Sequence, residues 1–144
     1  MNKNQKLILK FSEISKKDVP LVGGKNASLG EMFSQLDKKG IPVPDGFATT
    51  SFAYWQFLKE NNLLPKLKAI LKDLDIKDMK KLQQAGKEAR ELILGADFSE
   101  AFKKQIIDAY KNLSEKYGKI NTDVAVRSSA TAEDLPDASF AGQH

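Results

Sequence analysis

The chain enters its first predicted helix at Leu21-Val22-Gly23-Gly24-Lys25-Asn26-Ala27-Ser28-Leu29-Gly30-Glu31-Met32-Phe33. Two glycines open this stretch, and apolar side chains then recur at positions 29, 32, 33 and 36. This spacing predicts a glycine turn that leads into an amphipathic helix, and Gly40 is expected to end that helix. The turn places Lys25 beside backbone N–H groups and the positive end of the helix dipole, an arrangement that attracts anions. It is not a Walker A loop, because Asn26 stands where that motif has its Ser or Thr.

Two short extended segments flank this helix. Residues 7–11 are apolar and end at Ser12, a pattern that predicts a first strand. Residues 41–49 contain two prolines and a glycine, and they predict a stiff connector that leads into a second extended piece.

The middle of the chain predicts four further helices. Their expected starts are Thr50 or Ser51, Pro65, Asp78 and Ser99, and Gly95 and Gly118 are expected to end the last two. In the first of them, Phe52, Trp55 and Leu58, widened by Tyr54 and Phe57, predict an aromatic face in the core. In the last, the residues expected to face inward are Phe102, Ile106, Tyr110, Leu113 and Tyr117. Few short strands around a helix-rich middle indicate an α+β or an open α/β class, and we take α+β as the prediction.

The end of the chain is rich in residues with small or hydroxyl-bearing side chains. A β-branched run at residues 124–126 predicts a strand that carries Arg127 at its end. An arginine fork beside many backbone N–H groups is suited to gripping a polyphosphate. We therefore predict Lys25 and Arg127 as the two candidate phosphate contacts. Taken alone, Gly-Gly-Lys is also typical of a turn followed by an exposed lysine, and an arginine at a strand end often pairs with a surface acid. The other predicted nucleotide-binding residues are Ser128, Ser129 and Thr131, then Phe140 as a latch, and Gly142.

Composition narrows the classes of function. A share of 41% hydrophobic and 29% charged residues is typical of a soluble globular protein. No run approaches the roughly 18 apolar residues of a membrane span, and no signal-type segment follows the N-terminus, so we expect a cytoplasmic protein. The net charge of +4 comes from lysines interleaved with acids, which indicates solvated helix faces rather than a nucleic-acid interface.

Metal chemistry has few candidate ligands here. The chain has no cysteine and only one histidine, so thiolate and histidine-cluster sites are excluded. Glu133, Asp134 and Asp137 share one loop, where acids more often face solvent or lysines than a metal, and we predict no metal ligand in this chain. His144 has no acid or nucleophile in fixed relation to it.

Three separated blocks, residues 17–32, 43–50 and 124–142, resemble the N-terminus of the phosphoenolpyruvate synthase family. These enzymes belong to a wider family with pyruvate phosphate dikinase, rifampin phosphotransferase and glucan water dikinase, which share an ATP-grasp-like nucleotide-binding domain. The resemblance implies that residues 1–144 are the N-terminal part of such a domain in a larger enzyme. It also implies that Lys25 and Arg127 contact ATP phosphates.

For the complete enzyme, the resemblance implies conversion of ATP, pyruvate and water to AMP, phosphoenolpyruvate and phosphate, with Mg²⁺. The magnesium carboxylates, the pyruvate site and the phosphohistidine are expected beyond residue 144, and His144 is not the carrier. We therefore expect the 144 residues alone to be inactive, and the complete enzyme can be an oligomer. Arg127-Ser128-Ser129 and Leu135-Pro136-Asp137-Ala138-Ser139 differ from the dikinase pattern, which argues against the dikinase. A rifampin phosphotransferase-type domain and a non-catalytic anion-binding remnant stay open as alternatives.

Overall fold

A computed structural model describes residues 2–132 of the chain. The elements are the 3₁₀ helices η1 (Lys3–Gln5), η2 (Phe11–Glu13) and η3 (Lys16–Asp18), the strands β1 (Ile8–Lys10) and β2 (Phe47–Thr49), and the helices α1 (Val19–Asp37), α2 (Ser51–Glu60), α3 (Leu63–Leu71), α4 (Met79–Leu94) and α5 (Glu100–Lys116). This content confirms the predicted α+β class. The chain divides into two compact units: Tyr54–Glu100 forms the second, and the described residues before and after it form the first. Within residues 2–132, no helix is both long and apolar enough to cross a membrane.

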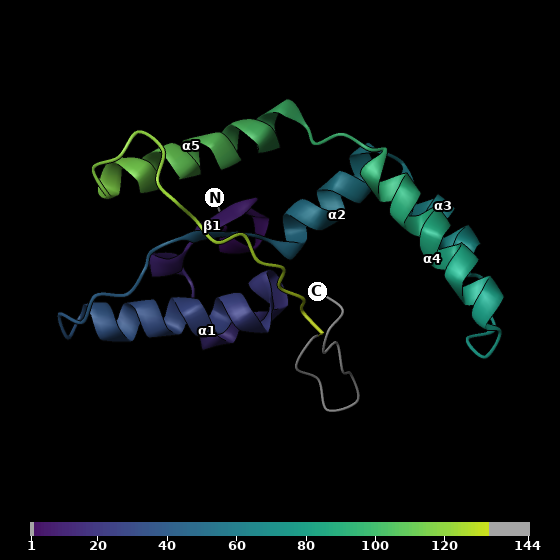
Figure 1. Cartoon of the computed structure of the whole chain (residues 1–144), viewed down its shortest axis with the longest axis horizontal. Coiled ribbons are helices and arrows are strands. Elements are labelled where there is room, and N and C mark those ends of the chain that lie inside the picture. The colour runs from purple at the N-terminus through teal and green to yellow at the C-terminus, as the bar shows by residue number, and fades with distance from the viewer. Residues whose placement is uncertain (1, 133–144) are drawn as a thin grey trace. The chain divides into compact units, whose positions relative to one another are not determined.

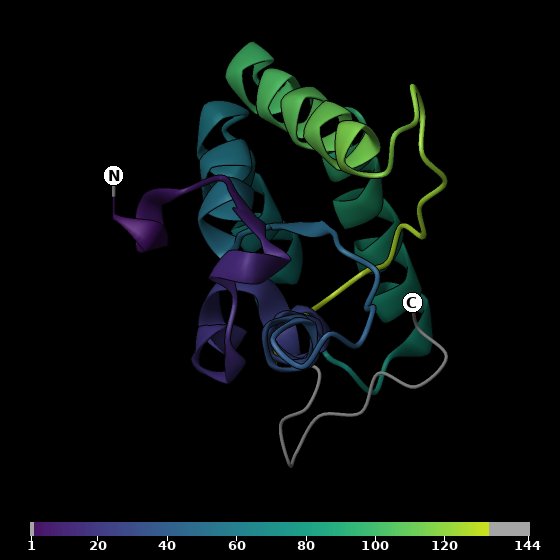
Figure 2. The same cartoon turned by 90° about the vertical axis from the view of Figure 1, so that its left-hand side faces the viewer.

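The first unit is built around a two-stranded antiparallel sheet. Leu9 of β1 lies opposite Ala48 of β2, and both side chains are buried. Their core also contains Ile14, Val22 and Ala27, so it joins the sheet to the residues before α1 and to α1 itself. Figures 1 and 2 show the strand pair between α1 and α5. Both predicted extended segments are therefore confirmed, and they pair with each other.

Helix α1 confirms the predicted glycine turn and also contains a helical turn that was not predicted. The helix begins at Val19 with a proline in its first turn, where a missing N–H costs nothing. Gly23 then leaves the helical region with φ 79° and ψ 165°, and the helix resumes after it. Gly40 adopts φ 70°, and the N–H of Ile41 donates to the carbonyl of Leu36 at 3.0 Å, so the predicted helix end is confirmed.

Thr50 caps α2, which resolves the two predicted cap positions. Its hydroxyl oxygen accepts from the N–H of Ala53 at 3.1 Å and donates to the carbonyl of Lys6 at 2.7 Å. The predicted core face is confirmed at Phe57 and Leu58, which are buried, and wrong at Tyr54 and Trp55, which are 48% and 55% exposed. The buried residues of α2 are Ala53, Phe57 and Leu58. This buried stripe is narrower than the predicted face, because the segments that pack on α2, and not the size of its aromatic side chains, decide which residues are buried.

The second unit confirms the predicted caps of its helices. Pro65 lies in the first turn of α3, the Asp78 side chain accepts from the N–H of Lys81 at 3.2 Å, and Gly95 ends α4. The core of this unit is formed by Phe57, Leu58 and Leu63, against which pack Leu64, Leu67, Leu92, Ile93 and Ala96. The unit therefore has a hydrophobic core of its own.

The segment after α5 corrects two predictions. Gly118 ends α5 with φ 63°, as predicted, but Tyr117 is 45% exposed instead of facing inward. Residues 124–126 form no strand, and Val126 is 93% exposed. A strand exists only as one member of a hydrogen-bonded pair, and within residues 2–132 no strand lies alongside this run.

Candidate functional site

The candidate site begins at the kink in α1. After Gly23 the helix resumes at Gly24, and Lys25 stands in the first turn of the resumed helix with its side chain exposed. A helix start directs its first N–H groups and the positive end of its dipole outward. The ammonium of Lys25 adds a full positive charge at the same end. The kink therefore places Lys25 at a helix start, and its anion-binding role stays a prediction.

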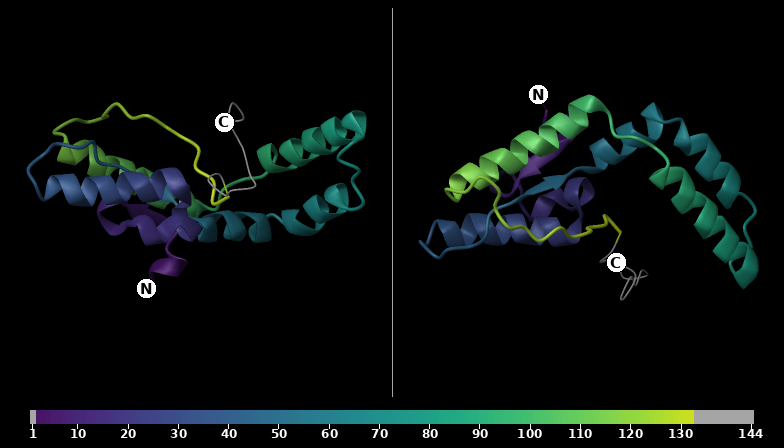
Figure 3. Two further views of the ribbon diagram at one scale, coloured as in Figure 1. Left: turned by 90° about the horizontal axis from the view of Figure 1, so that it is seen from below. Right: turned by 45° about the horizontal axis from the view of Figure 1, so that its top comes forward.

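The second part of the site is the segment that follows α5. This segment runs back along α1 toward the start of that helix (Figures 1 and 3). There the Ser129 hydroxyl donates to the carbonyl of Val22 at 2.9 Å, across 107 residues of sequence. A Cβ atom built on Gly23 would lie 2.3 Å from Ser129 Oγ and 2.9 Å from the carbonyl oxygen of Ala130. The two predicted phosphate motifs are therefore in direct contact, and only a glycine at position 23 permits the approach.

The predicted site residues fall into three groups. Lys25, Arg127, Ser128 and Thr131 are exposed, so their side chains are accessible to a ligand. Ser129 is partly buried and holds the contact with Val22. Phe140 and Gly142 lie outside the described residues, as do Glu133, Asp134, Asp137 and His144. Their predicted roles stay predictions.

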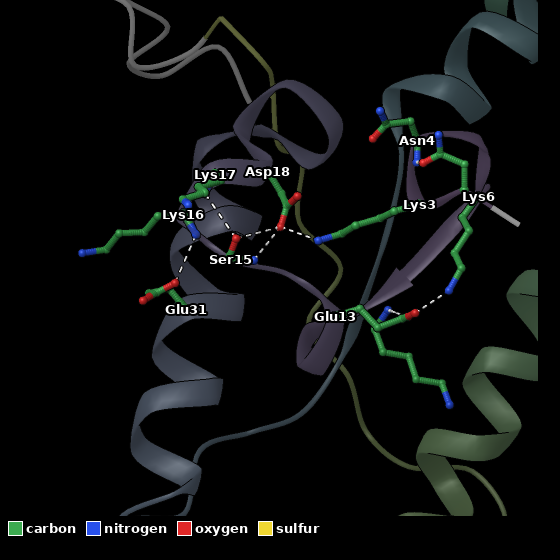
Figure 4. Close-up of polar contacts among 11 residues, drawn as sticks. Lys3, Asn4, Lys6, Glu13, Ser15, Lys16, Lys17, Asp18 and Glu31 are labelled. Carbon is green, nitrogen blue, oxygen red and sulfur yellow. Dashed lines mark hydrogen bonds and ion pairs between the residues drawn. The ribbon is translucent and has the colours of Figure 1, made fainter.

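Asp18, the residue directly before α1, has a carboxylate whose contacts the sequence did not predict. One oxygen of Asp18 accepts from Lys3 Nζ at 2.6 Å, from the N–H of Ser15 at 2.7 Å and from the Ser15 hydroxyl at 3.0 Å (Figure 4). Partial burial raises the pKa of Asp18, but the Lys3 ammonium and the two Ser15 donors together lower it below its usual value. The spacing Ser15-x-x-Asp18 is a capping-box pattern that could have revealed this group.

A second ion pair stabilises the same N-terminal region. Lys6 Nζ lies 2.6 Å from a carboxylate oxygen of Glu13, whose other oxygen accepts from the N–H of Lys10 at 2.9 Å (Figure 4). Partial burial raises the pKa of Glu13, but the contacts with Lys6 and Lys10 outweigh it and the pKa lies below its usual value. Together with Asp18, this pair fastens the chain that leads into α1.

The other end of the returning segment is held to α5. The Tyr110 hydroxyl donates to the carbonyl of Thr122 at 2.8 Å, and the Ser114 hydroxyl oxygen accepts from the N–H of Thr122 at 3.2 Å. Ser114 is 1% exposed, so this anchor is buried. Beyond it, residues 123–128 are exposed up to the contact made by Ser129. Arg127 thus lies on a strap with one anchor on α5 and one on α1.

The described residues of the candidate site combine positive charges with a helix start. Two cations and a helix start suit an anionic ligand. Among residues 2–132, no group of three histidine or acidic side chains is placed to hold a metal ion. The described part of the site is therefore suited to charge neutralisation and orientation of phosphates.

Comparison with known proteins gives a match over most of the chain. Residues 19–144 match the family described as pyruvate phosphate dikinase, AMP/ATP-binding domain. A phosphoenolpyruvate synthase of Aquifex aeolicus is 51% identical over 143 residues, which is 99% of this chain and 17% of that protein. One from Synechocystis is 53% identical over 146 residues (99% and 18%), and one from Helicobacter pylori is 52% identical over 133 residues (92% and 16%). The chain therefore spans less than a fifth of the length of each of these relatives.

Proposed function

The chain belongs to the family of the pyruvate phosphate dikinase AMP/ATP-binding domain, and we propose that it is the phosphate-binding part of the ATP site of a phosphoenolpyruvate synthase. The complete protein would convert ATP, pyruvate and water to AMP, phosphoenolpyruvate and phosphate in the cytoplasm. A phosphohistidine outside this chain would carry the phosphoryl group, and residues 1–144 would form the N-terminal part of an ATP-grasp-like domain. The names and high identity of the relatives support this choice.

One observation carries the proposal at the level of the site. The Ser129 hydroxyl donates a hydrogen bond to the Val22 carbonyl beside Gly23. Val22 and Ser129 are 107 residues apart in the sequence, so this bond brings the lysine motif and the arginine motif into contact. If Lys25 and Arg127 were surface cations with unrelated roles, their two segments would not need to approach so closely that only a glycine fits at position 23. The contact is therefore best explained as a joint between two halves of one anion site.

In this site Lys25 and Arg127 neutralise phosphate charge that shifts during phosphoryl transfer. Arg127 supplies a planar fork for two phosphate oxygens, and Lys25 supplies a compact charge at the helix start. The exposed hydroxyls of Ser128 and Thr131 are placed in the same segment for donation to phosphate. Phe140 and Gly142 complete the proposed nucleotide contacts, and the carboxylate ligands of Mg²⁺ are expected beyond residue 144.

The test measures ATP-dependent phosphorylation of the carrier histidine in the complete protein. Lys25→Met and Arg127→Met should each slow this step roughly 30- to 1,000-fold, because a charge-assisted contact in the transition state is worth about 2–4 kcal/mol. Arg127→Lys should also be slow, since an ammonium cannot replace the bidentate fork. Matched controls are Lys39→Met in the turn after α1 and Arg90→Met on α4, both exposed and outside the site.

The outcome separates the proposal from its alternatives. Near wild-type phosphorylation by Lys25→Met or Arg127→Met, with the controls also unchanged, would refute the assignment of that residue. Phosphoryl transfer to rifampin in place of pyruvate would identify a rifampin phosphotransferase. Nucleotide binding without any phosphorylated histidine would indicate a non-catalytic remnant.

A further inference from the structure

The carbonyl oxygen of Val22 accepts two side-chain hydrogen bonds. Asn26 Nδ2 donates to it at 3.0 Å, and Ser129 Oγ donates to it at 2.9 Å. A carbonyl oxygen has two lone pairs, so these two donors saturate it. Val22 is 4% exposed, and bonds that are partly screened from water hold their geometry better than exposed ones. One backbone atom thus ties together the start of the resumed helix and the returning segment.

Gly23 makes this double contact possible. Its φ of 79° interrupts the helix directly after Val22, and the Asn26 side chain, one turn later, reaches back to the carbonyl before the interruption. On the other side of the same glycine, Ser129 Oγ occupies the space that a Cβ atom would fill. Gly23 therefore permits both hydrogen bonds to the Val22 carbonyl, the one from Asn26 and the one from Ser129.

The hydrogen bond constrains what Ser129 can do for a ligand. A serine hydroxyl has one proton, and Ser129 gives it to an oxygen that can only accept. The phosphate oxygens of ATP at neutral pH are also acceptors. The Ser129 hydroxyl therefore cannot donate to a phosphate while it holds Val22, which differs from the direct contact that the sequence predicts.

We propose that Ser129 and Asn26 are positioning residues, which act on ATP through Arg127 and Lys25 by fastening both cation-bearing segments to the Val22 carbonyl. The inference rests on the proposed ATP site. Arg127 stands two residues before Ser129 and five after the anchor at Thr122. Between these anchors, residues 123–128 are exposed and form no hydrogen bond within the described part of the chain. Lys25 follows Val22 by three residues and precedes Asn26 by one, so each positioning residue has a neighbouring cation.

A double-mutant cycle on the complete protein tests the route of action. Ser129→Ala and Asn26→Ala should each raise the Kd for ATP roughly 2- to 10-fold, the range expected for loss of one hydrogen bond. In an Arg127→Met background, Ser129→Ala should add almost nothing, because the group it positions is gone. In a Lys25→Met background, the same should hold for Asn26→Ala. Ser28→Ala, an exposed serine on α1, is the matched control.

A measurement without ATP tests the fastening itself. Trypsin cleavage after the exposed Arg127 should be several-fold faster in Ser129→Ala than in wild type or Ser28→Ala, because cleavage follows local mobility. Unchanged cleavage would overturn the inference, as would a full Ser129→Ala effect on Kd in the Arg127→Met background. If Arg127→Met left the Kd for ATP unchanged while Ser129→Ala, with Arg127 intact, was still cleaved faster than wild type, the proposed ATP site would fail and the fastening role would stand.

Discussion

Gly23 is the residue on which the geometry of the site depends. Two separate constraints apply to it: a positive φ of 79°, which disfavours any side chain, and the contact with Ser129 and Ala130, which leaves no room for one. Gly40 shares the first constraint, with φ 70°, but nothing lies within 4 Å of its Cβ position. A comparison of Gly23 with Gly40 therefore separates the cost of a positive φ from the cost of a steric clash with a neighbouring segment.

We expect Gly23→Ala to destabilise the protein by more than Gly40→Ala. Gly40→Ala should cost about 1–2 kcal/mol, the usual penalty of a left-handed conformation. Gly23→Ala should add roughly 1–3 kcal/mol because the returning segment must move away. Urea unfolding measures both values, and an equal loss in the two variants would contradict the close contact.

At the scale of elements, α1 and α4 use glycine for opposite reasons. A Cβ atom on Gly30 of α1 would lie 2.4 Å from Ile14 Cβ and 2.8 Å from the Ile14 carbonyl oxygen, so this glycine lets the helix pack against the residue that follows η2. A Cβ atom on Gly86 of α4 would meet only Arg90 Nη1, at 3.2 Å, which is the far end of a flexible side chain. Gly30 is thus needed for packing, whereas Gly86 only lowers the helix propensity of α4.

Alanine substitutions should accordingly change stability in opposite directions. Gly86→Ala should stabilise the protein by about 0.5–1 kcal/mol through helix propensity. Gly30→Ala should destabilise it by roughly 1–3 kcal/mol, since Ile14 is buried and its backbone cannot yield cheaply. Thermal unfolding of both variants beside wild type checks this, and a stabilising Gly30→Ala would show that α1 does not pack on Ile14.

At the scale of the whole molecule, ion pairs between described residues link segments distant in sequence or stabilise the N-terminal turns. They are Lys3 with Asp18, Lys6 with Glu13, and Lys116 with Asp45. The hydrogen bond from Lys116 to Asp45 raises the pKa of Lys116, although partial burial opposes it. Lys116 also lies 4.9 Å from the ring centroid of Phe33, so it joins α5 to α1 as well as to the connector.

These shifts predict how stability depends on pH. Asp18 and Glu13 have lowered pKa values in the folded state, so their contribution is present above their ordinary values, roughly 4, and is lost as pH falls through the folded values. Lys116 has a raised pKa, so its contribution is present below roughly pH 10 and is lost above it. Urea unfolding from pH 2 to 11 should show a plateau with two falling limbs. Asp18→Asn should lower the plateau and flatten the acid limb, and an unaltered acid limb would exclude Asp18 as its cause.

The 144 residues alone should bind ATP weakly or not at all. The described residues bring the two proposed phosphate-binding segments into contact but hold no group of three possible metal ligands, and the chain spans less than a fifth of each relative compared above. Phosphate contacts without an adenine pocket or Mg²⁺ ligands supply only part of the binding free energy. Isothermal titration calorimetry is the measurement. Sub-micromolar, magnesium-dependent binding by this chain would mean that the main ATP contacts lie elsewhere than we expect.

The sequence by itself determined the helix ends, the two short strands and the candidate cations. Thr50, Asp78, Gly40 and Gly118 act through hydrogen bonds and backbone angles within a few residues, so local spacing was enough to locate them. Only the tertiary structure decided that α2 buries Ala53, Phe57 and Leu58 instead of Trp55, and that residues 124–126 stay unpaired.

The same division holds within the site. Lys25 and Arg127 could be predicted as phosphate contacts from their immediate sequence neighbours, and that assignment stays a prediction. The bond from Ser129 to Val22 could not be predicted in this way, and neither could the contact of Lys3 with Asp18. Lys3 and Asp18 are 15 positions apart in the sequence, and Val22 and Ser129 are 107 positions apart. Such contacts depend on which surfaces the fold brings together, and no local preference encodes that choice.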